Sequence, residues 1–292
     1  MLFNENSSRV KLYKAGKKWV TALLISGSLA GVGIIGSQIN PQVNAATPQA
    51  KQTVSNASQQ NPRLTQFNKD LNNSIGSPAG GAGGHGSEPL TLPTADGLGT
   101  KTSHQDLNVR YAANSIPGNY SVYYSVGNKP STFNAPGLSK QSPYATYQLK
   151  TFSNQDQASK YVKSINSSGS GSTVNLGHGI KGTKGGAAGS QYTNWNQQGY
   201  NLQTRQSNVS SNGGYSGIDK GTAGLLTQNK LPQLQKEING NGSNGAVNFD
   251  TTDTTQKGKL GQKIVFQQGS QVYQITAHDP VTAIKMATSV KA

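Results

Sequence analysis

The sequence contains no cysteine, few charged residues and few arginines. The absence of cysteine among 292 residues excludes disulfide bonds, thiolate nucleophiles and cysteine-bound metals. Charged residues make up 13% of the chain, against about 25% in a typical soluble protein. After residue 45 the only arginines are Arg63, Arg110 and Arg205. Because bidentate recognition of phosphates and base edges favours arginine over lysine, this composition argues against specific nucleic-acid binding.

The first 45 residues have the organisation of a signal peptide. Arg9 and the lysines up to Lys18 form a positive segment, and residues 20–35 carry no charge. Val43 and Ala45 then occupy the −3 and −1 positions of a small-residue cleavage site. An uncleaved transmembrane anchor is the alternative, but glycine and serine interrupt the apolar run, and a spanning helix needs about 20 apolar residues. We expect cleavage after Ala45 and no membrane anchor in the mature protein.

The positive segment also carries a specific pattern. "KLYKAGKKW" fits K-x-Y-K-x-G-K-x-W at all six specified positions, which are Lys11, Tyr13, Lys14, Gly16, Lys17 and Trp19. It resembles the KxYKxGKxW-type signal peptide of Gram-positive surface and secreted proteins. The resemblance covers only the leader and implies passage through the export machinery.

The net charge suggests what the exported protein meets outside the cell. Without the leader the chain keeps 21 basic and 10 acidic residues, a net charge of +11. A diffuse field of hydrated lysine charges suits retention on an anionic polymer, such as teichoic acid or another acidic glycan of a Gram-positive wall. The alternative is that the positive charge only keeps the protein soluble. We expect a secreted protein that is loosely associated with the cell wall.

Composition divides the mature chain into three parts. Residues 46–100 are rich in Gly, Ser and Gln, which predicts a disordered linker. Within it Leu64, Phe67 and Leu71 have helical spacing, but a helix there would be marginal without a partner. Residues 101–210 predict an α+β unit, and residues 211–292 predict a second, smaller α+β unit with a C-terminal helix.

Hydrophobic periodicity supports the α+β class. Alternation predicts strands in "NYSVYYSV", "SPYATYQLKTF" and "STVNLG", and a hairpin around "YTNWNQQGYNLQTR". Helices are predicted after Ser153 and after Asp279, the latter with Pro280 at its first position, and over "DKGTAGLLTQNKL". "NWNQQGYNLQT" and "IVFQQGSQVYQIT" form a weak internal repeat, each followed by a helix. We expect one or two small units of twisted antiparallel sheet, each with a packed helix.

The repeat, together with the closing "DPVTAIKMA", also resembles a family of secreted proteins and lipoproteins of lactobacilli. This resemblance spans roughly residues 90–292 and implies an exported α+β protein, without supplying an activity or site residues. The chain departs from the lipoprotein members because it lacks the lipidated cysteine.

No motif for catalysis, a metal or a cofactor is complete. The four histidines lack metal-binding spacing, and no G-x-S-x-G sequence is present. A glycosidase needs two convergent carboxylates. Most of the acidic residues here are explained by helix starts and turns, so few remain that could form such a pair. "GAGGHG" at residues 81–86 lacks the strand and helix that flank a dinucleotide loop. We therefore expect a non-enzymatic protein without cofactors.

Two features are candidates for ligand contact. "GHGIKGTK", residues 177–184, would place His178, Lys181 and Lys184 on an exposed Gly-rich loop that could hold a phosphate or sulfate, although the pattern favours a long hairpin loop without a ligand. Strand alternation directs Tyr120, Tyr124 and Tyr147 into the core. It leaves Tyr123 and Tyr144 for the surface, where tyrosine rings can stack on sugars.

Our leading hypothesis is a secreted, wall-associated, non-enzymatic protein that is retained by positive charge and binds an anionic wall polymer or glycan. The alternatives are a secreted hydrolase with an unrecognised site and a carrier of an amphiphile in an apolar groove.

Overall fold

The computed structural model describes residues 61–75, 90–98, 106–113, 119–167, 169–208, 217–232, 245–252 and 260–290. Their helices are α2 (Pro62–Ile75), the 3-10 helix η2 (Pro136–Lys140), α3 (Gln155–Lys163), α4 (Ile218–Gln228) and α5 (Pro280–Thr288). The strands are β1 (Leu107–Ala113), β2 (Tyr120–Val126), β3 (Ala145–Thr151), β4 (Ser172–Gly177), β5 (Ile180–Ala187), β6 (Ser190–Gln197), β7 (Tyr200–Ser207), β8 (Gly245–Asp250), β9 (Gln262–Gln268) and β10 (Gln271–Ala277).

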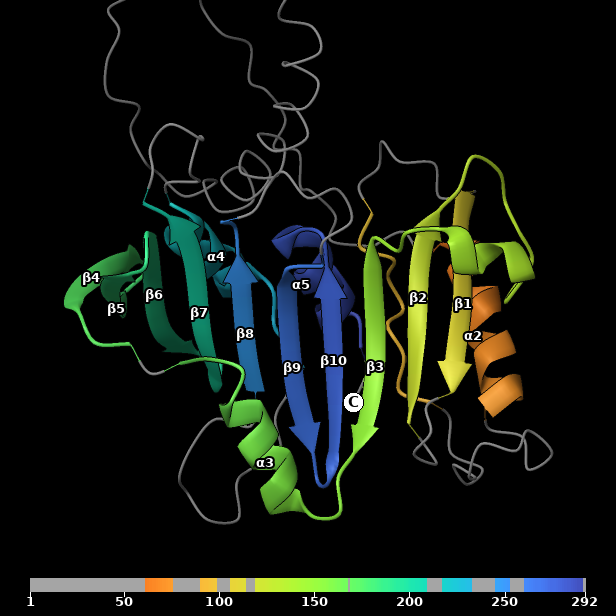
Figure 1. Cartoon of the computed structure of the whole chain (residues 1–292), viewed down its shortest axis with the longest axis horizontal. Coiled ribbons are helices and arrows are strands. Elements are labelled where there is room, and N and C mark those ends of the chain that lie inside the picture. Colours follow the sequence, from red (N-terminus) through yellow and green to blue (C-terminus); the bar gives the residue numbers. More distant parts are fainter. Residues whose placement is uncertain are drawn as a thin grey trace, which may run out of the picture.

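All ten strands join one sheet, in the order β1-β2-β3-β10-β9-β8-β7-β6-β5-β4 (Figure 1). Neighbours are antiparallel except β7 and β8, which are parallel and are connected through α4. The α+β class is confirmed, but the sheet is larger than the small units that we expected. Hydrogen bonding continues from β7 to β8 across residue 210, so both predicted units contribute to one sheet and one core.

The sheet has one apolar face and one polar face. On the core face, side chains such as Tyr147, Leu202 and Ile264 are fully buried, and α2, α4 and α5 pack there. On the polar face most of the alternate positions are amides, hydroxyls and charged groups. Among the α-helices, α3 is on the polar face, opposite α2, α4 and α5 (Figure 1). There Ala158 and Val162 pack on a small apolar cluster of Ala246, Val265 and Val272.

The predicted linker is wrong for two segments, which are integral to the core. In α2, Leu64 and Leu71 are fully buried and Phe67 is 5% exposed. Residues 90–98 form a strap that joins α2 to the body: the Thr91 carbonyl accepts from the Tyr147 hydroxyl, and Thr94 bonds to Ser289. The sheet supplies the partner that α2 needs for stability. The rest of the predicted linker, residues 46–60, 76–89 and 99–100, lies outside the described residues.

Local signals explain most of the other elements. Asp279 caps α5 by accepting from the Thr282 N–H at 2.7 Å, with Pro280 at the first helical position, as predicted. Helix α3 begins one residue later than predicted, because Asn154 rather than Ser153 is the N-cap. The two repeat motifs occupy equivalent places, since hairpins β6–β7 and β9–β10 are each followed by a helix on the core face.

The Gly-rich segment 177–184 is a tight hairpin rather than a loop. His178 and Gly179 both have positive φ, 53° and 74°, which is the pattern of a two-residue type I′ turn. The same pattern joins β5 to β6 at Ala188–Gly189 and β6 to β7 at Gln198–Gly199, with φ of 55° at Gln198 and 80° at Gly199. Strands β4 to β7 therefore form a compact meander, in which the register of β4 against β5 shifts between Asn175 and Gly177.

Candidate functional site: an amide-lined pocket

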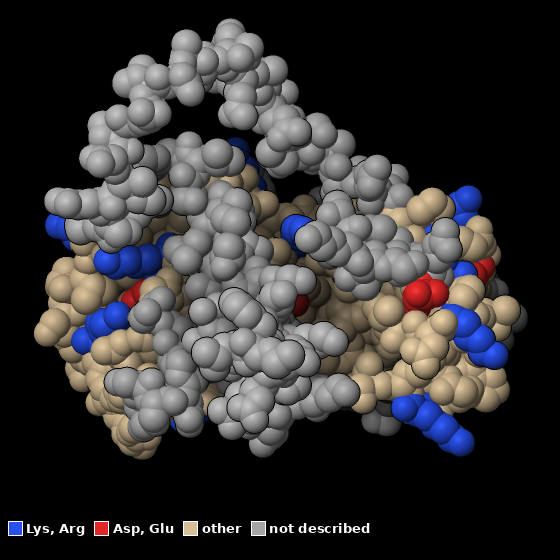
Figure 2. Space-filling model, turned by 90° about the horizontal axis from the view of Figure 1, so that it is seen from above, with Lys and Arg blue, Asp and Glu red and all other residues tan. Residues whose placement is uncertain are grey.

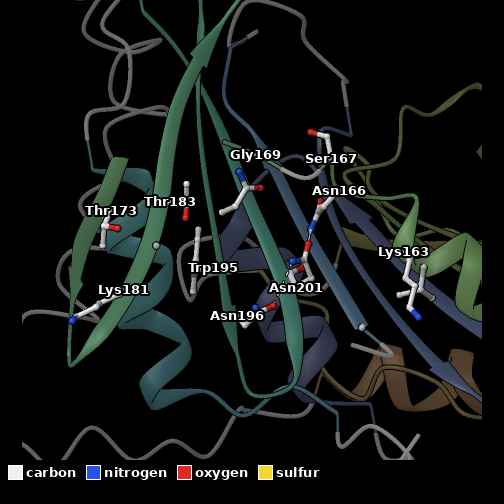
Figure 3. Close-up of a pocket in the computed structure, with 14 residues that line it drawn as sticks. Lys163, Asn166, Ser167, Gly169, Thr173, Lys181, Thr183, Trp195, Asn196 and Asn201 are labelled. Carbon is white, nitrogen blue, oxygen red and sulfur yellow. Dashed lines mark hydrogen bonds between the residues drawn. The ribbon is translucent and has the colours of Figure 1, made fainter. Parts of the chain in front are cut away.

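An open pocket of about 690 Å³ lies on the polar face, between the end of α3 and strands β4 to β7 (Figure 3). We call it the amide pocket, because four asparagines line it together with three hydroxyl side chains and two lysines: Asn166, Asn194, Asn196, Asn201, Ser167, Thr173, Thr183, Lys163 and Lys181. It forms because the chain crosses the polar face after α3 to reach β4 at the far edge of the sheet.

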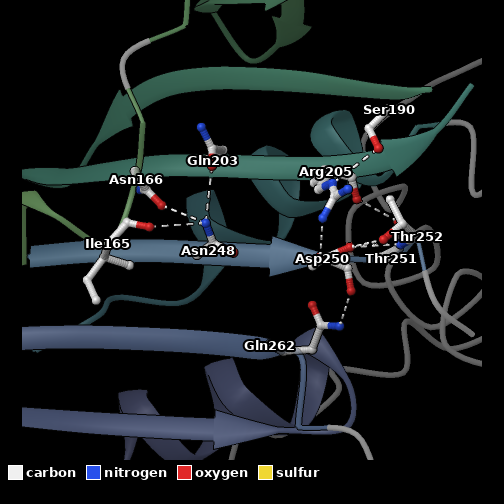
Figure 4. Close-up of polar contacts among 10 residues, drawn as sticks. All are labelled: Ile165, Asn166, Ser190, Gln203, Arg205, Asn248, Asp250, Thr251, Thr252 and Gln262. Atoms are coloured by element: carbon white, nitrogen blue, oxygen red, sulfur yellow. Dashed lines mark hydrogen bonds and ion pairs between the residues drawn. The ribbon is translucent and has the colours of Figure 1, made fainter. Parts of the chain in front are cut away.

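A network of amide hydrogen bonds fixes this crossing segment to the sheet (Figure 4). The Asn166 side chain donates to the carbonyl of Asn201 at 2.8 Å and accepts from Asn248 Nδ2 at 2.9 Å. The Gln203 side chain donates to the Ser167 carbonyl at 3.0 Å and to Asn194 Oδ1 at 2.8 Å. Buried amide networks of this kind rigidify what they connect, so the pocket wall is held in one place.

Three other polar residues of the pocket differ in how far they are exposed or bonded. Asn194 Nδ2 is buried and has no hydrogen-bond partner within the described structure, although its Oδ1 is held by Gln203. Gly169 faces this nitrogen so closely that a Cβ at position 169 would lie 2.2 Å from it. Asn196 and Thr173 are exposed. An unpaired buried amide donor costs about 1–3 kcal/mol. Because Gly169 covers this nitrogen, the exposed Asn196 and Thr173 are the groups that a ligand in the pocket would meet.

The pocket is positively charged. None of the residues that line it is acidic, and Lys163 and Lys181 stand at opposite ends (Figure 3). On the face that Figure 2 shows, the described lysines and arginines lie in separate places rather than in one patch. The arginines have structural contacts: Arg63 donates to the Leu107 carbonyl, Arg110 lies 3.7 Å from the ring centre of Tyr123, and Arg205 pairs with Asp250 at 3.2 Å. Lysines thus supply the positive charge of the pocket.

The three residues predicted around the Gly-rich segment do not converge. Lys181 lines the pocket and is exposed. His178 is exposed in the turn between β4 and β5. Lys184 points to the core face, where its Nζ lies 2.8 Å from Asp219 Oδ2. The reason is strand geometry, since residues 181 and 184 differ by an odd number of positions and so face opposite sides of β5.

Asp219 is the buried partner of Lys184 at the start of α4. It is 2% exposed, and its carboxylate also accepts from the Thr193 hydroxyl at 3.1 Å and from the Lys220 N–H at 2.8 Å. Burial alone would raise the pKa of Asp219, but these hydrogen bonds and the charge of Lys184 hold that pKa below its ordinary value. The pair joins α4 to β5 and β6 and takes no part in the pocket.

The two predicted surface tyrosines also lie apart. Tyr123 is on the polar face of β2, half-buried under Arg110 and distant from the pocket in the strand order. Tyr144 packs against the core, and its hydroxyl donates to the Asp96 carbonyl at 2.9 Å. Burial, followed by the nearby Asp96 carboxylate, raises the pKa of Tyr144. Tyr120, Tyr124 and Tyr147 are buried as predicted.

Sequence reasoning missed the asparagines of the pocket. They come from the segment that follows α3, from β6 and from β7, and their individual positions resemble any polar surface. The detectable signal was the alternation Asn194, Asn196 along one face of β6, opposite the buried Trp195. Within the described parts of the chain, no three His, Asp or Glu side chains are grouped to hold a metal ion.

Comparison with known proteins identifies the leader. Residues 5–45 match the KxYKxGKxW signal peptide family. Comparisons with curated proteins and with solved structures gave no match. No helix in the described ranges is long and apolar enough to cross a membrane. The chain is thus a secreted protein that carries a KxYKxGKxW signal peptide.

Proposed function

We propose that the mature protein is a non-enzymatic binding protein of the cell wall, and that the amide pocket binds an anionic, hydroxyl-rich wall polymer or glycan. The observation that carries this proposal is the lining of the pocket, in which amides and hydroxyls lie between two lysines. Asparagine and threonine side chains both donate to and accept from hydroxyl groups, and lysine ammoniums attract phosphate or carboxylate. The net charge of +11 after removal of the leader favours the same class of ligand at longer range.

The binding test compares two double variants with equal charge. Lys163→Met with Lys181→Met removes both pocket cations, and Lys129→Met with Lys140→Met removes two other exposed cations. We expect the pocket variant to bind isolated Gram-positive walls at least about tenfold more weakly than the control variant, a difference of ~1.4 kcal/mol. The measurement is sedimentation of purified protein with the walls at about 0.15 M salt.

Three outcomes of this test would contradict the proposal in different ways. Equal weakening of both variants means that net charge alone retains the protein. About 1 M salt reduces the Debye length to ~3 Å. If the protein still binds in this salt, and also binds walls without teichoic acid, the ligand is not anionic. Release of soluble sugar or phosphate from the walls would favour a hydrolase.

Processing of the leader gives a separate prediction. We expect intact-mass analysis of the exported protein to show a new N-terminus at Ala46, because Val43 and Ala45 fit the small side-chain pockets of a signal peptidase. Ala45→Leu should block cleavage at this bond and leave the protein at the membrane. An exported wild-type protein with an intact leader would show that Ala45 is not the site.

A further inference from the structure

The two edge strands of the sheet, β1 and β4, differ in whether another segment covers them. At one edge, the segment before η2 covers β1: the Asn134 N–H donates to the Val109 carbonyl at 3.1 Å, and its side chain accepts from the Tyr111 N–H at 3.2 Å. Ser131 donates its N–H to Asn108 Oδ1 at 2.7 Å. The Val109 carbonyl and the Tyr111 N–H, which face away from β2, are therefore occupied, and this opposes the addition of a further strand there.

The opposite edge, β4, is open. Its sequence is STVNLG, without a charge or a proline, and Ser172, Thr173 and Asn175 are exposed. In Figure 1 no described segment lies beyond β4 at this end of the sheet. The backbone hydrogen bonds of β4 to another strand, within the described structure, go to β5 on one side only. Natural sheets usually protect such an edge with lysine, proline, a β-bulge or a covering segment. The register between β4 and β5 shifts between Asn175 and Gly177, so the regular and open part of the edge is residues 172–175.

We infer that β4 is a self-association edge, at which a second copy of this chain adds its own β4 in antiparallel register. Two identical strands related by a two-fold axis are self-complementary in backbone hydrogen bonding. The mature chain carries +11, but β4 itself is uncharged. Pairing of two β4 strands, which we call the join, therefore brings no like-charged side chains of β4 opposite each other. Because the β1 edge is covered, the association stops at two copies and does not continue into a fibre.

The dimer places two amide pockets on one surface. Antiparallel pairing keeps equivalent faces of the two sheets on the same side, and Thr173 of β4 already lines the pocket. The two pockets therefore lie on either side of the join, with Lys181 toward the join in each copy and Lys163 away from it. A linear polymer could occupy both at once, which would raise the overall affinity through an effective concentration in the millimolar range.

The absence of native cysteine makes a direct test possible. Three separate single variants, Thr173→Cys, Val174→Cys and Asn175→Cys, scan β4. Ala113→Cys serves as control on the opposite edge strand, where Ala113 is also exposed at the end of β1. Facing residues of antiparallel strands have Cα atoms about 4.5–5.5 Å apart, within the range of a disulfide. We expect the variant nearest the two-fold axis to form a covalent dimer under mild oxidation, at least fivefold faster than Ala113→Cys.

A second measurement uses no cysteine. Sedimentation of the mature wild-type protein at about 100 µM should give twice the monomer mass, and Thr173→Lys, which places like charges at the join, should return it to the monomer. Ala113→Lys should leave the dimer intact. A monomeric wild-type protein, a dimer that Thr173→Lys does not affect, or equal cross-linking by all four cysteine variants would overturn the inference. None of these results depends on whether the pocket binds a polymer.

Discussion

Replacing Leu64 with alanine should lower the free energy of unfolding by about 2–5 kcal/mol, although the residue lies in a segment whose composition predicts a linker. The leucine is fully buried on the core face, where its helix α2 packs beside β1. Loss of the side chain removes its transfer free energy and leaves a cavity. Urea unfolding of the purified mature protein measures the change.

Asn73→Ala is the matched control, because Asn73 is exposed on the same helix. It should change the free energy of unfolding by no more than about 0.5 kcal/mol. If Leu64→Ala has an effect as small as this, α2 does not belong to the cooperative unit, and the folded body begins later in the chain.

Lys184→Met should destabilise the fold by about 3–5 kcal/mol, because it leaves the Asp219 carboxylate buried without its cation. Replacing both partners, with Lys184→Met and Asp219→Leu together, should recover most of this loss, since two apolar groups carry no desolvation penalty. Lys220→Met, beside Asp219 but exposed, is the control and should be nearly neutral. If the double variant is no more stable than Lys184→Met alone, the unpaired Asp219 carboxylate is not the cause of the destabilisation.

The same pair should make the wild-type fold sensitive to acid. The pKa of Asp219 is lower in the folded than in the unfolded chain, so its contribution is complete above the unfolded value, ~3.9, and is lost as the pH falls through the folded value. The free energy of unfolding should therefore fall less steeply below pH 4 in Asp219→Asn than in the wild type. Equal slopes would show that Asp219 does not have a lowered pKa.

The elements that follow from local rules could be predicted from the sequence. Asp279 with Pro280 specifies the start of α5, and the alternation of Tyr120, Val122 and Tyr124 specifies β2, because caps and strand faces depend on near neighbours. The helical spacing of Leu64 and Leu71 was visible too. The stability of helix α2 could not be predicted, because the apolar surface that buries those leucines comes from strands far along the chain.

The pocket and strand β5 required non-local information. The sequence KGTKGGA has weak strand propensity, and the hydrogen bonds from β4 and β6 impose the strand. Glycine is needed at position 185, because a Cβ there would lie 2.2 Å from the carbonyl oxygen of Ser170 as the crossing segment passes over β5. The pocket exists only because the segment after α3 crosses the polar face to β4, and no local pattern encodes that path.

The pairing of β3 with β10 has a consequence for the order of folding. Residues 145–151 meet residues 271–277, so the middle of the sheet joins segments made early and late. Until the last strand emerges, β1 to β3 expose one side of β3 with no partner, whereas the meander β4 to β7 closes through two-residue turns between neighbours. Long-range strand pairing is slow because a large loop must close first. During export, β1 to β3 therefore keep the β3 edge unpaired, and open to pairing with another chain, until β10 is available.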